Sequence, residues 1–282
     1  MLRRPPPAAL APYVRWLWYL DDAGAIGLPG AARATRERAL PTGAMDLVIR
    51  LSDTPIRLYA EVEAPVATSY GHAVLGGARS CYYVRDTTVP VRSVGVHFRP
   101  GGAAAVLGVP ADLLAERHTA LTDLWGPRVD AVRTRILEAT DAGDALDRLA
   151  AALPRPTELH PAVAHALARF AAADVRTVDA VRRETGLSSR RFIELFRRYV
   201  GLTPKVYCRV RRFQAVVARA GRGLSWAEVA LTAGYFDQAH LNRDFRAFAG
   251  VSPGAYRPLA PDRPNHVPIP SIPSKPPRGA PG

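Results

Sequence analysis

Amide and guanidinium side chains gather on one side of a short stretch of the sequence, GYFDQAHLNRDFRAFAGVSP, residues 234–253. Its apolar residues recur at i, i+4 and i+7, the spacing of one face of a helix: Leu241, Phe245 and Phe248. Gln238, Asn242 and Arg243 fall outside that face. Amide and guanidinium groups form paired hydrogen bonds with base edges in the major groove of DNA. The stretch therefore predicts a helix that packs by its apolar face and offers these groups to a nucleic acid.

The sequence contains a second copy of this stretch. FRRYVGLTPKVY (196–207) and FRAFAGVSPGAY (245–256) share the pattern Phe-Arg-x-aromatic-x-Gly-apolar-hydroxyl-Pro-x-x-Tyr, and corresponding residues lie 49 positions apart. Upstream, GLSSRRFIELF (186–196) parallels GYFDQAHLNRDF (234–245), apart from one extra residue in the turn. A duplication at this spacing indicates two copies of one supersecondary unit.

Each copy has the pattern of a helix-turn-helix unit. In the second, a helix over 225–233 ends at Gly234, whose permissive backbone suits a turn, and the next helix begins after the turn. In the first, a helix over 177–185 ends at Gly186, and Ser188 is the expected N-cap of the following helix. The residues predicted to face inward are Phe192, Leu195, Phe196 and Tyr199 in the first unit, and Trp226, Val229 and Ala230 in the second.

Each unit ends in a hydroxyl residue followed by proline, which signals the start of another helix. In Thr203-Pro204 and Ser252-Pro253 the hydroxyl caps the helix and the proline takes its first position. The helix predicted over 204–219 joins the two units and holds them apart; its inward residues are Val206, Val210, Phe213 and Val217. Units about one DNA turn apart, roughly 34 Å, let one chain enter successive major grooves.

The positive charge of the chain is concentrated in these units. The formal net charge is +13; residues 174–258 hold 16 Lys and Arg against 7 Asp and Glu, whereas residues 1–173 hold 19 against 17. This asymmetry favours a polyanionic partner for the C-terminal part. A genomic bias towards Arg and Ala is the alternative explanation, so the charge indicates a polyanionic partner only in combination with the motifs.

Residues 174–258 resemble the DNA-binding domain of the AraC/XylS family of bacterial transcription regulators, a pair of helix-turn-helix units joined by a helix. The strongest agreement is GY-x-D-Q-x-H-L-x-R-x-F-x-x-x-x-G-V-S-P-x-x-Y-R, which ends at Arg257. The resemblance implies sequence-specific binding of promoter or operator DNA, with RNA polymerase as a partner if the protein activates transcription. It assigns DNA contacts to outward residues of the recognition helices: Ser189, Arg190, Ile193, Glu194 and Arg197, and Gln238, Ala239, His240, Asn242 and Arg243.

Two positions depart from the family pattern. Arg182 lies four residues before Gly186, where the family usually has a small alanine, as the second unit has at Ala230. The first unit is therefore expected to be splayed or less stable. Phe236 stands where a short capping residue is usual, which leaves Asp237 as the expected cap of the second recognition helix.

Several residues have a structural interpretation beside the functional one. A basic helix face either holds phosphates or is only solvated, and this applies to Arg197, Arg198, Arg209, Arg211 and Arg212. Ile193 and Glu194 are poor phosphate ligands, although Ile can touch a thymine methyl and Glu can accept from cytosine. His240 either touches DNA or packs at the helix start. Trp226 is expected in the core, and Cys208 is expected to be only a small helix residue.

The predicted fold class is α+β in two domains: a mostly-β N-terminal sensor domain, cupin- or jelly-roll-like, with following helices, and an all-α C-terminal domain. Runs rich in aromatic and branched residues predict strands at 13–20, 44–51, 80–86 and 91–98, and helical spacing predicts helices at 101–107, 128–152 and 160–173. The predicted divisions are a β-rich effector or dimerisation domain with its helices (1–152), a linker (153–159), the DNA-binding domain (160–258) and a disordered Pro-rich tail (259–282).

The N-terminal half, from APYVRWLWYL to LWG, resembles the N-terminal domain of one subgroup of AraC-like regulators, which implies control by an unidentified small-molecule effector, by homodimerisation, or by both. Aromatic residues of the predicted strands either line a pocket or pack a core: Trp16, Trp18, Tyr82 and Tyr83. Residues 99–102 either cradle an anion or form a plain strand-to-helix turn. His72 and His97 stand 25 residues apart without a His partner, so we predict no metal site and no cofactor.

The sequence predicts no enzyme, because it has no Ser-His-Asp signature, phosphate loop or paired-carboxylate motif. The alternative is a DNA-targeted enzyme such as a cysteine-dependent alkyl-transfer repair protein. Cys81 and Cys208 are the only cysteines, and neither has zinc spacing or an adjacent base to lower its pKa. No apolar run approaches the ~18 residues of a membrane helix, and MLRRPPPAAL lacks a signal-peptide core. The expected location is the cytoplasm, at the nucleoid, with no membrane partner.

Overall fold

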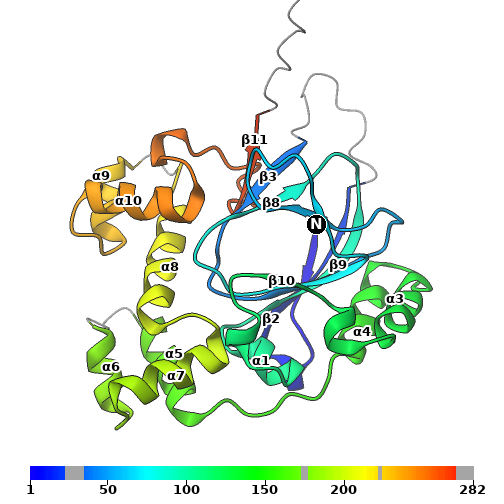
Figure 1. Cartoon of the computed structure of the whole chain (residues 1–282), viewed down its shortest axis with the longest axis horizontal. Coiled ribbons are helices and arrows are strands. Elements are labelled where there is room, and N and C mark those ends of the chain that lie inside the picture. Colours follow the sequence, from blue (N-terminus) through cyan, green and yellow to red (C-terminus); the bar gives the residue numbers. More distant parts are fainter. Residues whose placement is uncertain (23–34, 173–176, 222–223, 271–282) are drawn as a thin grey trace, which may run out of the picture.

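A computed structural model of the chain describes residues 1–22, 35–172, 177–221 and 224–270. The architecture is α+β, as the sequence predicts, with a β-rich N-terminal part and a C-terminal part that holds two helix-turn-helix units (Figure 1). The four strands predicted from aromatic and branched runs are all present, at positions within a few residues of those expected.

Two antiparallel β-sheets form the N-terminal part. One has six strands in the order β1-β2-β9-β4-β7-β10, and the other has five in the order β11-β3-β8-β5-β6. The strands are β1 (Leu2–Arg4), β2 (Val14–Asp21), β3 (Arg36–Ala39), β4 (Asp46–Arg50), β5 (Arg57–Tyr59), β6 (Thr68–Ser69), β7 (Ala73–Gly76), β8 (Tyr83–Asp86), β9 (Arg92–Phe98), β10 (His118–Ala120) and β11 (His266–Ile269).

Strand β9 runs through the middle of the six-stranded sheet and is buried on both faces beyond its first residue. Val94, Val96 and Phe98 belong to the buried apolar core. Gly95 pairs with Trp18 of β2, and a side chain at Gly95 would overlap the Trp18 ring and the Leu47 carbonyl oxygen. The glycine therefore allows the indole ring to lie across β9 on the side that faces the other sheet.

Helices cover the six-stranded sheet and continue into the C-terminal part. They are η1 (Ala8–Leu10), α1 (Gly102–Leu107), η3 (Ala111–Leu113), α2 (Thr122–Trp125), α3 (Arg128–Leu137), α4 (Ala142–Ala152), α5 (Pro161–Ala171), α6 (Val178–Glu184), α7 (Ser189–Val200), α8 (Pro204–Val217), α9 (Trp226–Thr232), α10 (Gln238–Ala249) and η4 (Pro253–Ala255). The prediction of an α-helix after Ser252-Pro253 is wrong in extent, because η4 is a single 3₁₀ turn that ends at Ala255.

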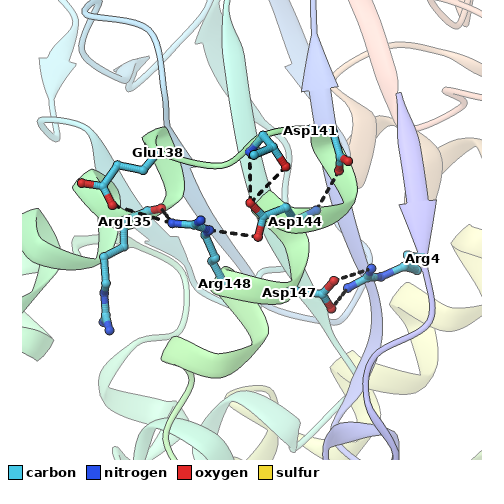
Figure 2. Close-up of polar contacts among 8 residues, drawn as sticks. Arg4, Arg135, Glu138, Asp141, Asp144, Asp147 and Arg148 are labelled. Atoms are coloured by element: carbon cyan, nitrogen blue, oxygen red, sulfur yellow. Dashed lines mark hydrogen bonds and ion pairs between the residues drawn. The ribbon is translucent and has the colours of Figure 1, made fainter.

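The single helix predicted over 128–152 is also wrong, since the chain breaks there into α3 and α4. Asp141 adopts an extended backbone and its side chain accepts from the Asp144 N–H at 2.9 Å, so it caps a new helix (Figure 2). The guanidinium of Arg4 pairs with the Asp147 carboxylate, which ties α4 to the edge strand β1 (Figure 2). Periodicity alone did not reveal the break because both helices bury the same kind of apolar stripe.

The buried apolar core is continuous from the six-stranded sheet through α1 to α7, α8 and α10. Gly201, which ends α7, shows how close the contact is. Its φ is +90°, and a Cβ there would lie 3.1 Å from the Ala111 carbonyl oxygen and 3.3 Å from Met45 Cε. Glycine thus satisfies both the left-handed helix end and the close approach of the N-terminal part.

The C-terminal segment corrects the prediction of a disordered tail from residue 259. Residues 259–270 return to the N-terminal part, and β11 pairs with β3 in antiparallel register, from His266 opposite Ala39 to Ile269 opposite Arg36. The Pro-rich composition of this segment suggested disorder, but prolines in an edge strand do not prevent that strand from pairing on one side. Residues 271–282 lie outside the described residues.

Candidate nucleic-acid interface

The first helix-turn-helix unit consists of α6 and α7. Ser188 Oγ accepts from the Arg191 N–H at 3.3 Å, which confirms Ser188 as the N-cap of α7. Phe192, Leu195 and Phe196 are buried, and Phe196 packs against Tyr207 of α8 with ring centroids 5.5 Å apart. The apolar stripe of α7 thereby fixes which face of the helix remains in solvent.

The outward face of α7 carries the five residues that the sequence assigns to DNA, and all five are exposed: Ser189, Arg190, Ile193, Glu194 and Arg197. Arg190 Nε lies 2.8 Å from Glu194 Oε1, an i,i+4 ion pair. This hydrogen bond from Arg190 lowers the pKa of Glu194, so the acid is ionised and already paired. Within the described residues Arg197 has no ion pair, which leaves it the more available cation.

The Arg182 guanidinium makes two polar contacts at the turn of the first unit. Its Nε lies 2.8 Å from Asp179 Oδ1, and its Nη1 donates to the Leu187 carbonyl oxygen at 2.9 Å. The guanidinium therefore spans the turn and satisfies a backbone acceptor there. The second unit has buried Ala230 at this position, whose carbonyl accepts from the Tyr235 N–H at 2.9 Å.

The second unit consists of α9 and α10. Asp237 Oδ1 accepts from the His240 N–H at 2.6 Å, so Asp237 caps α10 as the sequence predicts. At the start of α9, Ser225 and Glu228 form a reciprocal capping box. Trp226 is half-buried and packs edge-on against Phe245 at 5.8 Å between centroids, so it packs against the core rather than lying fully within it.

The outward face of α10 combines exposed and half-buried residues. Gln238, Ala239 and Arg243 are exposed, whereas His240 and Asn242 are half-buried. The His240 ring meets Tyr235 edge-on at 5.1 Å, so it packs at the helix start. Phe236, which departs from the family pattern, lies in the preceding turn directly before the cap of α10 and is 88% exposed.

Sequence reasoning missed a buried ion pair between α8 and α10. Asp244 is 3% exposed, and its Oδ1 accepts from Arg209 Nη2 at 2.6 Å. The Arg209 guanidinium also lies 5.2 Å from the centroid of Phe248. The signal was present, because Asp244 stands three residues after Leu241 on the apolar face of the predicted helix. A carboxylate at such a position needs a cation from a neighbouring element.

Arg209 and Arg212 of α8 therefore stabilise the second unit as well as adding positive charge. Arg212 lies 5.4 Å from the centroid of Tyr235, and its Nη1 donates to the Gly234 carbonyl oxygen at 3.4 Å. Of the basic residues expected either to hold phosphates or only to be solvated, Arg209 and Arg212 have contacts within the protein. Arg197 and Arg198 on α7 are exposed. Figure 1 shows α8 running between the α6–α7 unit and the α9–α10 unit.

The aromatic residues of the predicted strands in the N-terminal half were expected either to line a pocket or to pack a core. Trp16, Trp18 and Tyr83 line a cavity of about 180 Å³. Tyr82 instead packs against Gly250 at the end of α10, and its N–H donates to the Phe248 carbonyl oxygen at 2.9 Å. Three of the four residues thus belong to a pocket wall, and the fourth joins the N-terminal part to the second unit.

Residues 99–102 form a plain strand-to-helix turn. A Cβ at Gly102 would overlap the Tyr13 carbonyl oxygen, and a Cβ at Gly101 would lie 3.2 Å from Leu159. The Arg99 side chain donates to the Ala11 carbonyl oxygen at 2.9 Å. The turn is packed on both sides by protein, which leaves no cradle for an anion.

The cysteines do not provide an activated nucleophile. Burial raises the pKa of the Cys81 thiol, and the Glu116 carboxylate raises it further. Burial also raises the pKa of Cys208 to about 11. A thiol whose pKa is raised is mostly protonated at neutral pH and attacks slowly. Neither thiol therefore has the lowered pKa that cysteine-dependent alkyl transfer requires.

Comparison with known protein families agrees with this geometry. A helix-turn-helix domain model of the AraC type matches residues 182–258, which include α7, α8, α9 and α10. The C-terminal part of this chain is an AraC-type helix-turn-helix domain. Residues 2–120 match a domain of unknown function, DUF6597, and no curated protein matches the chain. The AraC-type domain supports a role for the chain in DNA binding and transcription regulation.

Among solved structures, the chain is similar to ToxT from Vibrio cholerae. One ToxT structure at 1.65 Å resolution is 10% identical, with a TM-score of 0.44 over 85% of this chain and 96% of that chain. A second, of ToxT with a bound unsaturated fatty acid, is 9% identical, with a TM-score of 0.43 over 85% of this chain and 92% of that chain. In the described part of the chain, no helix combines the length and apolar character that a membrane crossing requires.

Proposed function

We propose that the protein is a sequence-specific transcriptional regulator of the AraC type that inserts α7 and α10 into successive major grooves of promoter DNA. The observation that carries the proposal is the pair of capped recognition helices whose predicted contact residues are mostly exposed, all five on α7 and three of the five on α10. A helix with its N-terminal residues outward fits the major groove, where amide and guanidinium groups distinguish bases.

The two units are proposed to bind differently. On α10, Gln238, Asn242 and Arg243 supply hydrogen-bond donors suited to adenine and guanine edges. On α7, Ile193 offers an apolar contact to a thymine methyl, and Glu194 accepts from cytosine only if Arg190 releases it. We therefore expect α10 to contribute most of the direct base recognition.

The N-terminal part is proposed to modulate this activity through a small-molecule effector, through homodimerisation, or through both, and the protein is proposed to act at the nucleoid in the cytoplasm. The apolar core that it shares with α7 and α8 supports such control, because packed side chains can transmit a conformational change from the β-rich part to the recognition units. RNA polymerase is the further partner if the protein activates transcription.

The test is selection of DNA by the full chain from a library of randomised duplexes, followed by sequencing of the bound fraction and a salt titration of the selected duplex. We expect two half-sites about one helical turn apart and an affinity that falls steeply with salt, because basic residues displace counterions. A bound fraction without sequence preference would overturn the proposal. One half-site instead of two would restrict it to α10.

A further inference from the structure

The facing sides of the two sheets enclose a cavity of about 180 Å³. Trp16 and Trp18 stand at alternate positions of β2 and so project to the same side, and Tyr83 comes from β8 of the opposite sheet. A cavity of about 150 Å³ accepts a benzene ring. This cavity therefore has room for one substituted aromatic ring, with aromatic side chains from both sheets in its wall.

The cavity wall carries more cations than anions. Three arginines line it against two aspartates: Arg3, Arg79 and Arg263, and Asp46 and Asp262. One of the aspartates is already engaged, because Asp46 Oδ1 lies 2.7 Å from His97 Nδ1. A guanidinium group that lines a partly buried cavity is stabilised by an anion. The charges of the wall thus favour a negatively charged occupant.

Among the three arginines of the wall, Arg79 is the one whose guanidinium has a buried nitrogen without a partner. Its Nε is buried without a hydrogen-bond acceptor, and in the described ranges no carboxylate lies within ion-pair distance of it. Its Nη2 lies 3.3 Å from His118 Nδ1, and the group stacks 4.9 Å from the Tyr83 centroid. Burial, with the Arg79 charge, lowers the pKa of His118 to about 3, so His118 is neutral. Buried donors without acceptors are rare in folded proteins.

We propose that this cavity binds a small aromatic carboxylate, with its carboxylate on the Arg79 guanidinium and its ring among Trp16, Trp18 and Tyr83. A guanidinium and a carboxylate are both planar and form two parallel hydrogen bonds. The inference rests on the proposed function, since it names the class of effector for the regulator. The donor set is distinct from the DNA-binding residues of α7 and α10.

The cavity wall is attached to the helix that joins the two DNA-binding units. Gln214 of α8 donates through Nε2 to the Pro41 carbonyl oxygen at 2.7 Å and to Asn265 Oδ1 at 2.9 Å. Pro41 and Asn265 both line the cavity. The segment after α10 is also held, because Tyr256 Oη donates to the Pro264 carbonyl oxygen at 2.6 Å. An occupant of the cavity therefore acts on α8 and on the segment after α10 through their hydrogen bonds to the wall.

Calorimetric titration of the full chain with benzoate and phenylacetate tests the site, with benzamide and phenylacetamide as neutral probes of matching shape. We expect at least one carboxylate to bind at least tenfold more tightly than its amide. Arg79→Met should weaken carboxylate binding at least tenfold, whereas Arg117→Met, which changes an exposed arginine of the same sheet region, should leave it unchanged. Ala44→Leu, which fills the cavity and keeps Arg79, should abolish binding.

Absence of carboxylate binding to the wild-type chain, or equal binding by Arg79→Met and wild type, would overturn the site. The coupling is tested by the Kd for the selected duplex with and without the bound carboxylate. We expect a change of at least fivefold, and the same factor in carboxylate affinity when DNA is added. Gln214→Met should reduce that factor below two while retaining carboxylate affinity. An unchanged Kd in the wild-type chain would overturn the coupling.

Failure of the proposed function gives a different result from failure of this site. If the chain selects no DNA but binds the carboxylate through Arg79, the site stands and the DNA-binding proposal fails. If the chain selects DNA and binds no carboxylate, the reverse holds.

Discussion

The two helix-turn-helix units share one backbone plan and differ in the chemistry of their outward faces. From Ser188 to Tyr207, every residue lies 49 positions before its counterpart in the second unit. Both recognition helices have an oxygen cap and end at a glycine with positive φ. Yet Glu194 stands where the second unit has Arg243, and Ile193 stands where it has Asn242. The cap and the apolar stripe are common to both units, while the charge at one outward position, Glu194 against Arg243, is reversed.

The same comparison extends into the core. Leu195 of the first unit packs among apolar residues, and its counterpart Asp244 is equally buried but needs Arg209 of α8. The first unit meets the N-terminal part through Gly201, whereas the second is tied to α8 by charge. A duplicated unit can therefore keep a buried charge where a neighbouring helix supplies the partner.

The largest expected effect comes from breaking that buried pair. Arg209→Met should destabilise the protein by about 3 kcal/mol, because Asp244 is left charged and buried without its partner. Asp244→Leu installs the residue of the first unit and should cost less than about 1 kcal/mol, since the remaining guanidinium is partly exposed and can reach water. Urea denaturation followed by circular dichroism measures both. Equal losses for the two variants would contradict the asymmetry.

Removal of the charge that distinguishes α10 should be next in size. Arg243→Ala is expected to lower affinity for the selected duplex by about 1 to 3 kcal/mol and to abolish base preference at one position. Arg246→Ala changes another exposed arginine of the same helix and should lower affinity without altering preference. Repeating the selection with each variant provides the measurement. An unchanged preference in Arg243→Ala would remove its assigned role.

The turn of the first unit offers a smaller test. Arg182→Ala gives the first unit the residue of the second but removes the donor to the Leu187 carbonyl oxygen. We expect a loss of about 1 kcal/mol, the usual contribution of one hydrogen bond. The family pattern instead predicts a gain in stability for this variant, because a small alanine is usual at the position of Arg182. A higher urea midpoint in Arg182→Ala would support the pattern against the observed contact.

The smallest effect is expected at Glu194. Glu194→Ala removes a negative charge from the outward face of α7 and frees Arg190 from its ion pair. Non-specific DNA affinity should rise slightly, and the slope of log affinity against log salt should steepen by about one phosphate contact. Fluorescence anisotropy over a salt series measures the slope. A steep loss of sequence preference instead would mean that Glu194 itself contacts a base.

The periodic and capped parts of the fold were predictable from the sequence. Ser188 and Asp237 begin the recognition helices where their side-chain chemistry predicts, and the strands from 13–20 to 91–98 follow from their branched and aromatic residues. The break at Asp141 and the pairing of β11 were not predicted. Asp141 lies between two helices of similar apolar spacing, and β11 depends on a partner strand more than two hundred residues away in the sequence.

The duplicated units, their caps, the concentration of positive charge and the outward faces of the helices follow from local patterns in the amino-acid sequence. These features are local, because helix periodicity and N-cap chemistry act within a few residues. The pairing of Asp244 with Arg209, the place of Arg79 in a cavity wall, and the link from Gln214 of α8 to that wall became evident only in the folded chain. Those outcomes depend on which distant elements pack together, and packing is selected by the shape and charge of the whole core.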